Sequence, residues 1–179
     1  MTPTDFYRTI LAPAAEFCAP ILAARDCPEA RCMLLAIAGQ ESGWRNIHQD
    51  GGPAVDPWQH EIGSIRALKL NITTQRYMHS MARAVGCGTD PDSIYAALLG
   101  DMRLAYGCAR LLLWTVPQPL PAIGDHTETL RQYRWTWRPG AWDTAPRALE
   151  AFQRWQRVYP QAAAAVQPEP APAGATKED

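Results

Sequence analysis

A carboxylate inside an apolar helical pattern is the first feature of this chain that could do chemistry. The segment LLAIAGQESGWR places Leu34, Ile37, Ala38 and Glu41 at positions i, i+3, i+4 and i+7, which share one face of a helix. Burial on that face disfavours the charged form of the carboxyl group, and the negative end of the helix dipole acts in the same direction. We therefore expect a raised pKa for Glu41, as a general acid near neutral pH requires.

The residues around Glu41 suggest what such an acid would act on. Gly43 is predicted to end the helix and turn the chain away, which leaves the carboxyl group at the wall of a groove. Sugar rings pack on aromatic faces, and the chain is rich in tryptophan and tyrosine. In the alternative interpretation Glu41 bends towards solvent at a frayed helix end, and the aromatic residues belong to the core.

Residues 41–59, ESGWRNIHQDGGPAVDPWQ, resemble the active-site segment of the lysozyme-like superfamily, in particular lytic transglycosylases and goose-type lysozymes. Five positions match this pattern, with a glutamine eighteen residues after the glutamate: Glu41, Ser42, Trp44, Ala54 and Gln59. Two positions depart from it, because Pro53 and Asp56 stand where glycines are usual.

Two later segments extend the resemblance. YAALLGDMRLAYGCARLL, residues 95–112, is similar to the second helix that lines the groove, and YRWTWRPG, Tyr133–Gly140, is similar to the C-terminal block of phage endolysins. The resemblance implies cleavage of the β-1,4 bond between N-acetylmuramic acid and N-acetylglucosamine in peptidoglycan, without a cofactor, for phage lysis. Glu41 is the predicted catalytic residue, and the predicted substrate-binding residues are Ser42, Trp44, Gln59, Tyr95, Tyr106, Tyr133 and Trp137.

The sequence leaves the reaction type open. A hydrolase of the inverting type needs a second carboxylate to activate water, and Asp50 and Asp56 are the candidates in the loop. A transglycosylase needs none, because the 6-hydroxyl of the substrate itself attacks. The five matched positions favour the transglycosylase, whereas Asp56 favours the hydrolase. The alternative function is not enzymatic: the protein would be a non-catalytic relative that binds the cell wall or forms part of a virion.

Other chemistries find little support. His48, Asp50, His60 and Glu61 have no spacing typical of metal ligands, so we predict no metal. Ser42 is not part of a G-x-S-x-G motif, which argues against a serine nucleophile. The five cysteines form no CxxC pair and are expected to be free thiols.

The pattern of the whole chain predicts an all-α fold of lysozyme-like type, with at most a rudimentary β-hairpin after the catalytic helix. Pro13 and Pro20 are expected to break or kink the first helical stretch. Helices are expected over about 28–41, 58–68, 101–114, 126–137 and 145–159. Another is expected from 73 or 74 to 86 or 88, and Asp90-Pro91-Asp92 is expected to cap a further helix before residue 101. Residues 1–160 form the predicted catalytic domain, and 161–179 a disordered tail rich in alanine and proline.

The composition limits which partners the protein is expected to bind and where in the cell it is expected to be made. The formal net charge of the 179 residues is −1, so no broad basic field indicates nucleic acid, although six arginines gather between positions 131 and 157. No apolar run is long enough to cross a membrane, and the N-terminus has no signal-peptide pattern. We expect a monomer made in the host cytoplasm, which acts on peptidoglycan strands after release or as part of a virion.

Overall fold

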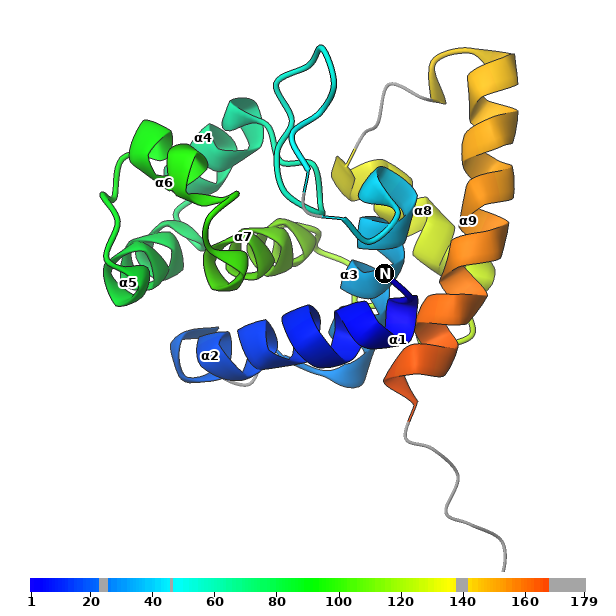
Figure 1. Cartoon of the computed structure of the whole chain (residues 1–179), viewed down its shortest axis with the longest axis horizontal. Coiled ribbons are helices and arrows are strands. Elements are labelled where there is room, and N and C mark those ends of the chain that lie inside the picture. The colour runs from blue at the N-terminus through cyan, green and yellow to red at the C-terminus, as the bar shows by residue number, and fades with distance from the viewer. Residues whose placement is uncertain (23–25, 46, 138–141, 168–179) are drawn as a thin grey trace, which may run out of the picture.

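The structure is a computed structural model that describes residues 1–22, 26–45, 47–137 and 142–167 (Figure 1). Of the described residues 69% are helical, which confirms the predicted all-α class. Within the described residues the β structure is one isolated antiparallel bridge between Val55 and His60, in the loop that follows the proposed catalytic helix. This bridge is the rudimentary β element expected at that position.

The N-terminal helix runs through both of its prolines, so the predicted break is wrong. Helix α1 (Pro3–Phe6), a π-helical turn η1 (Tyr7–Leu11) and helix α2 (Ala12–Leu22) follow one another without interruption. The wide π turn ends two residues before Pro13, and such turns relieve the clash of a proline ring with the preceding turn. Pro20 lies two residues before the end of α2, where few later turns depend on it.

Helix α3 (Pro28–Ser42) is the central element of the fold and carries Glu41. Pro28 occupies its first turn, and Gly43 ends it with a φ of +63°, as the sequence predicts. Leu34, Ile37 and Ala38, which share the stripe with Glu41, are fully buried. Since neighbouring helices cover α3 on nearly all sides, its exposed end is the place where a side chain can meet a ligand.

A group of four helices lies on one side of α3, on the left in Figure 1: α4 (Ile62–Leu70), α5 (Gln75–Val85), α6 (Pro91–Ala97) and α7 (Met102–Trp114). The carboxylates of Asp90 and Asp101 cap α6 and α7 by accepting backbone N–H bonds. Helix α4 begins at Ile62 and not at Trp58 as predicted. The turn before it contains Asp56 and Gln59, both with positive φ, and no helix can include such residues.

On the other side of α3 lie α8 (His126–Trp137) and the long α9 (Ala145–Val166), which packs along α3 (Figure 1). The predicted start of the tail at residue 161 is wrong, since α9 continues for another six residues and buries Ala162 completely. The rest of the predicted tail, from 168, and the predicted helix stop at Arg138–Gly140 lie outside the described residues.

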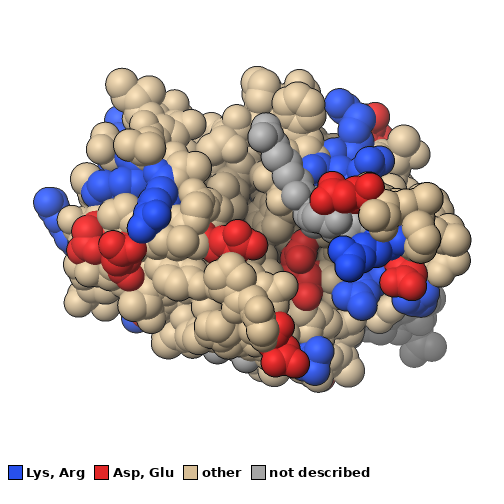
Figure 2. Space-filling view, turned by 90° about the horizontal axis from the view of Figure 1, so that it is seen from above, with Lys and Arg blue, Asp and Glu red and all other residues tan. Residues whose placement is uncertain are grey.

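The charged side chains of the face in Figure 2 are mixed in sign, and the cysteine thiols are unpaired. Figure 2 shows that on this face Lys and Arg gather mainly at its two ends and are mixed with Asp and Glu, without one continuous basic field. Each of the five cysteines is free, and Cys18, Cys32 and Cys108 are buried among apolar side chains. Among the described residues no helix combines the length and the apolar composition that a membrane span requires.

Candidate active site

The carboxyl group of Glu41 lies in the last turn of α3 and meets a side chain from α8. Glu41 is half-buried, and its Oε1 atom accepts a hydrogen bond from the hydroxyl of Tyr133 at 2.5 Å. Tyr133 is almost completely buried and stacks on Trp155 of α9, with 4.8 Å between the ring centroids. The hydroxyl that holds Glu41 is therefore fixed by two helices far away in the sequence.

Burial raises the pKa of Glu41 from its ordinary value of 4.5 to about 6. Three interactions favour the carboxylate and oppose this rise: the hydrogen bond from Tyr133 first, then the charges of Arg154 and His60. Burial and the nearby charge of Glu41 also raise the pKa of Tyr133, so its hydroxyl keeps the proton and acts as the donor. The raised pKa agrees with the prediction made from the helical stripe.

Glu41 opens onto a pocket of about 390 Å³ between α3, α8 and α9. Seven residues line it: Gln40, Glu41, Tyr133, Arg147, Glu150, Ala151 and Arg154. Two hydrogen bonds at 3.1 Å tie its walls together, from the Gln40 amide to the carbonyl oxygen of Ala151 and from Arg154 to the carbonyl oxygen of Gln40. The pocket thus places two guanidinium groups and a second carboxylate around Glu41.

The α9 residues of this pocket were not among the predicted site residues. Arg147, Glu150, Ala151 and Arg154 lie at i, i+3, i+4 and i+7, so the periodicity of the predicted helix 145–159 places them on one face. That signal identifies a shared face, but it does not reveal which other element the face meets. The partner is α3, about a hundred residues earlier in the chain.

Ser42 and Trp44, predicted to bind substrate, both make hydrogen bonds that stabilise the end of α3. The Ser42 hydroxyl donates to the carbonyl oxygen of Ala38 at 2.9 Å and accepts from the backbone N–H of Arg45 at 3.1 Å. The Trp44 indole donates to the carbonyl oxygen of Leu35, and a Cβ atom at Gly39 would lie 2.5 Å from the Trp44 ring. The aromatic side chain therefore packs directly on the helix backbone where Gly39 leaves room.

Gln59 and Trp137 also bond to the backbone of the loop region. The Gln59 amide donates to the carbonyl oxygens of Ile47 at 3.2 Å and Asp56 at 2.7 Å, which closes the loop. The Trp137 indole donates to the carbonyl oxygen of Trp58 at 2.9 Å and so connects α8 to the same loop. Both side chains remain half-buried, hence part of each still faces solvent.

The two predicted tyrosines of the α6–α7 region bond to groups other than Glu41. The hydroxyl of Tyr95 donates to the carbonyl oxygen of Pro53 and connects α6 to the loop. Tyr106 is completely buried and donates to Asp26 at 2.9 Å, so the prediction that it binds substrate is wrong. Of the predicted substrate-binding residues, only Tyr133 makes a hydrogen bond to the carboxyl group of Glu41.

The two candidates for a second carboxylate differ in exposure. Asp50 is exposed at the tip of the loop. Asp56 is completely buried; Oδ1 accepts the backbone N–H of Trp58 at 2.7 Å, and Oδ2 accepts from Nδ1 of His60 at 2.6 Å. With both oxygens bonded inside the loop, Asp56 cannot activate a water molecule next to a substrate, and that hypothesis is wrong.

Comparison with protein families, with curated proteins and with solved structures finds no match for this chain. Within the described residues, no group of three or more His, Cys, Asp or Glu side chains has the arrangement of a metal site. The geometry and electrostatics around Glu41 are therefore the features of this chain that indicate an activity.

Proposed function

We propose that this protein degrades peptidoglycan by cleaving the β-1,4 bond between N-acetylmuramic acid and N-acetylglucosamine, with Glu41 as the general acid, and that it serves phage lysis of the bacterial cell wall. The observation that carries the proposal is a carboxyl group with a pKa of about 6 at the wall of an open pocket. Perturbed carboxyl groups of this kind cluster at functional sites, and glycosidic cleavage near neutral pH requires one.

The geometry around Glu41 supports this role. Because Tyr133 keeps its proton and donates to Oε1, the acidic proton of Glu41 belongs on Oε2. Below pH 6 that proton is available for the glycosidic oxygen of a bound strand. The carboxylate formed after proton transfer is stabilised by the Tyr133 hydrogen bond and the charge of Arg154, the two largest interactions that favour its charged form.

The loop favours a lytic transglycosylase over a hydrolase. Since Asp56 is committed to Trp58 and His60, Asp50 is the one loop candidate left to activate water, and Glu150 of α9 is the other carboxylate that lines the Glu41 pocket. In the transglycosylase route the 6-hydroxyl of the muramic acid unit attacks its own C1 atom, and the bond to the leaving sugar breaks. The carboxylate of Glu41 then takes the proton of that hydroxyl, which restores the acid and leaves a 1,6-anhydro ring.

A zymogram on peptidoglycan tests the proposal with wild type, Glu41→Gln and the surface control Glu16→Gln. We expect lysis by wild type and Glu16→Gln, and a loss of about 10²–10⁴-fold for Glu41→Gln. More than a tenth of the wild-type activity in Glu41→Gln contradicts the role of Glu41. Wild type that binds the wall without cutting it supports the non-catalytic alternative.

Mass spectrometry of the digested wall distinguishes the two reactions. Muropeptides that end in 1,6-anhydro-muramic acid are the expected product. Reducing ends, about 18 Da heavier by one water molecule, identify a hydrolase instead. In that case Asp50→Asn is the variant to examine for loss of the general base, with Asp56→Asn as its comparison.

A further inference from the structure

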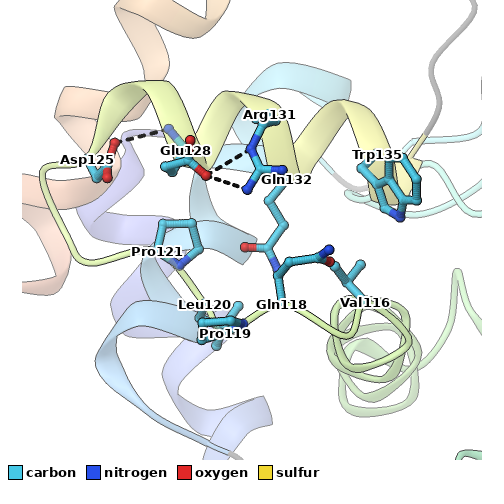
Figure 3. A pocket seen from close by; sticks show the side chains of 10 residues that line it. All are labelled: Val116, Gln118, Pro119, Leu120, Pro121, Asp125, Glu128, Arg131, Gln132 and Trp135. Atoms are coloured by element: carbon cyan, nitrogen blue, oxygen red, sulfur yellow. Dashed lines mark hydrogen bonds and ion pairs between the residues drawn. The ribbon is translucent and has the colours of Figure 1, made fainter.

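A second pocket, of about 260 Å³, lies between α8 and the segment Val116–Pro121 that follows α7 (Figure 3). It shares no lining residue with the Glu41 pocket. In Figure 3 the helix passes above the pocket and the proline-containing segment passes below it, with Trp135 at one end and Asp125 and Glu128 at the other.

The carboxamide of Gln132 is the unusual feature of this pocket. Gln132 is only 5% exposed, yet neither its Nε2 nor its Oε1 atom has a hydrogen-bond partner among the described residues. Figure 3 shows the side chain extending from α8 towards Gln118 and Pro119 on the opposite wall. Buried polar groups are almost always bonded, so a donor and an acceptor left without partners side by side need an explanation.

The two unpartnered atoms indicate the chemistry of a ligand. A carboxamide presents an oxygen acceptor and N–H donors, so Gln132 can accept from the N–H of a secondary amide or donate to its C=O. Pro119, Leu120 and Val116 provide an apolar wall for the methyl group of an acetamide. The volume is near the lower limit for ligand pockets and suits one sugar ring better than a long chain.

The ends of the pocket fit the rest of an amino sugar. Trp135 is 60% exposed and offers an indole face, on which the C–H face of a sugar ring can pack. Asp125, Glu128 and Arg131 supply oxygen acceptors and N–H donors for hydroxyl groups at the other end. Arg131 is already paired with Glu128, at 2.8 Å from Nε, and the carboxylates outnumber it; the pocket is therefore ill suited to a phosphate-bearing ligand.

We propose that this pocket binds an N-acetylated amino sugar, with its acetamide group on Gln132 and its ring on Trp135. Binding of the sugar depends on the pocket alone; its use, to hold a glycan strand at a distance from Glu41, rests on the proposed function. Tyr133 and Gln132 are neighbours on α8, so one helix serves both sites: Tyr133 positions the acid, and Gln132 takes the sugar.

The test is a titration of the ¹⁵N-labelled protein with N-acetylglucosamine, followed by NMR at the side-chain amide of Gln132. The signal is assigned by its absence from the spectrum of Gln132→Leu, or of Gln132→Met if the leucine variant does not fold. We expect this signal to shift with N-acetylglucosamine, and the apparent affinity to fall at least tenfold for glucosamine, which lacks the acetyl group. Trp135→Ala should weaken binding, whereas Phe152→Ala, a truncation of another exposed aromatic residue, should not.

Three outcomes overturn the inference. They are a Gln132 signal that does not move with N-acetylglucosamine, an equal response to glucosamine, and tighter binding of an N-acetylated dipeptide, which would make the pocket a peptide site. Glu41→Gln separates the two proposals, because it should abolish lysis and leave the Gln132 response intact. Lysis without a Gln132 response refutes only the second pocket, and a Gln132 response without lysis by wild type refutes only the proposed function.

Discussion

Two carboxyl groups close together in the sequence, Glu41 and Asp56, lie in contrasting surroundings. Asp56 receives hydrogen bonds from Trp58 and His60, which belong to the same loop, and it is completely buried. Glu41 receives its hydrogen bond from Tyr133, a residue of α8, and faces a pocket whose other wall is α9. One group is surrounded by local donors, and the other by helices from the C-terminal third of the chain.

The difference explains which carboxylate can do chemistry. Donors that bond both oxygens leave no site for a substrate, so Asp56 keeps the loop in shape. Glu41 has a donor at one oxygen and a pKa raised to about 6, hence a proton to give near neutral pH. The loop after α3 has a structural role. Helices α8 and α9 supply the side chains that surround the carboxyl group of Glu41.

The largest effect on stability is expected from Asp56→Ala. Removing this carboxylate leaves His60 and the N–H of Trp58 buried without their acceptor, which should cost roughly 3 kcal/mol of the free energy of unfolding. Denaturant titration measures the loss. Asp92→Ala is the control, because the exposed ion pair of Asp92 with Arg66 should be worth less than about 1 kcal/mol. Equal losses in both variants would contradict the structural role of Asp56.

Glu41→Gln should have the opposite effect on stability. The pKa of Glu41 is raised in the folded state, so between about pH 4.5 and pH 6 the unfolded chain loses this proton first and stability falls as pH rises. Glutamine removes that penalty, so the variant should be more stable above pH 6 by roughly 2 kcal/mol, with no gain below pH 4. Unfolding curves at pH 4 and pH 8 test it; a variant less stable at pH 8 would refute burial as the cause.

Tyr133→Phe should change the pH profile of lysis. The hydroxyl lowers the pKa of Glu41, so without it the pKa rises above 6 and the acid remains protonated to higher pH. We expect the alkaline fall of the activity to move upward in pH. Tyr159→Phe is the matched control, since that hydroxyl accepts from the N–H of Gly124 and is not among the groups that shift Glu41. An unchanged pH profile of lysis in Tyr133→Phe would show that the Tyr133 hydroxyl does not affect the pKa of Glu41.

The smallest effects are expected at the C-terminus. Deleting residues 168–179 should change neither the melting temperature nor the activity, because their composition predicts no contribution to a core. Deleting residues 161–179 also removes the last turns of α9 with the buried Ala162, which should cost about 1 kcal/mol. A large loss of lysis from the shorter deletion would instead indicate a segment that binds the wall.

Local sequence patterns determined most of the helices and the unusual state of Glu41. The stripe of Leu34, Ile37 and Ala38 predicts a buried face at a fixed spacing, and Gly43 predicts the left-handed turn that ends α3. Both signals act within one or two turns of helix, where geometry follows directly from residue type. For the same reason the raised pKa of Glu41 could be predicted without its partners.

Tertiary structure decided what surrounds the carboxyl group. The matched positions Ser42, Trp44 and Gln59 bond to nearby backbone, so their pattern predicts a loop shape better than contacts with a substrate. Tyr133 and the α9 face with Arg154 reach Glu41 only because α8 and α9 pack against α3. Periodicity gives each helix a buried face but not the identity of its partner, since any apolar face can cover any other. Packing of the whole chain makes that choice.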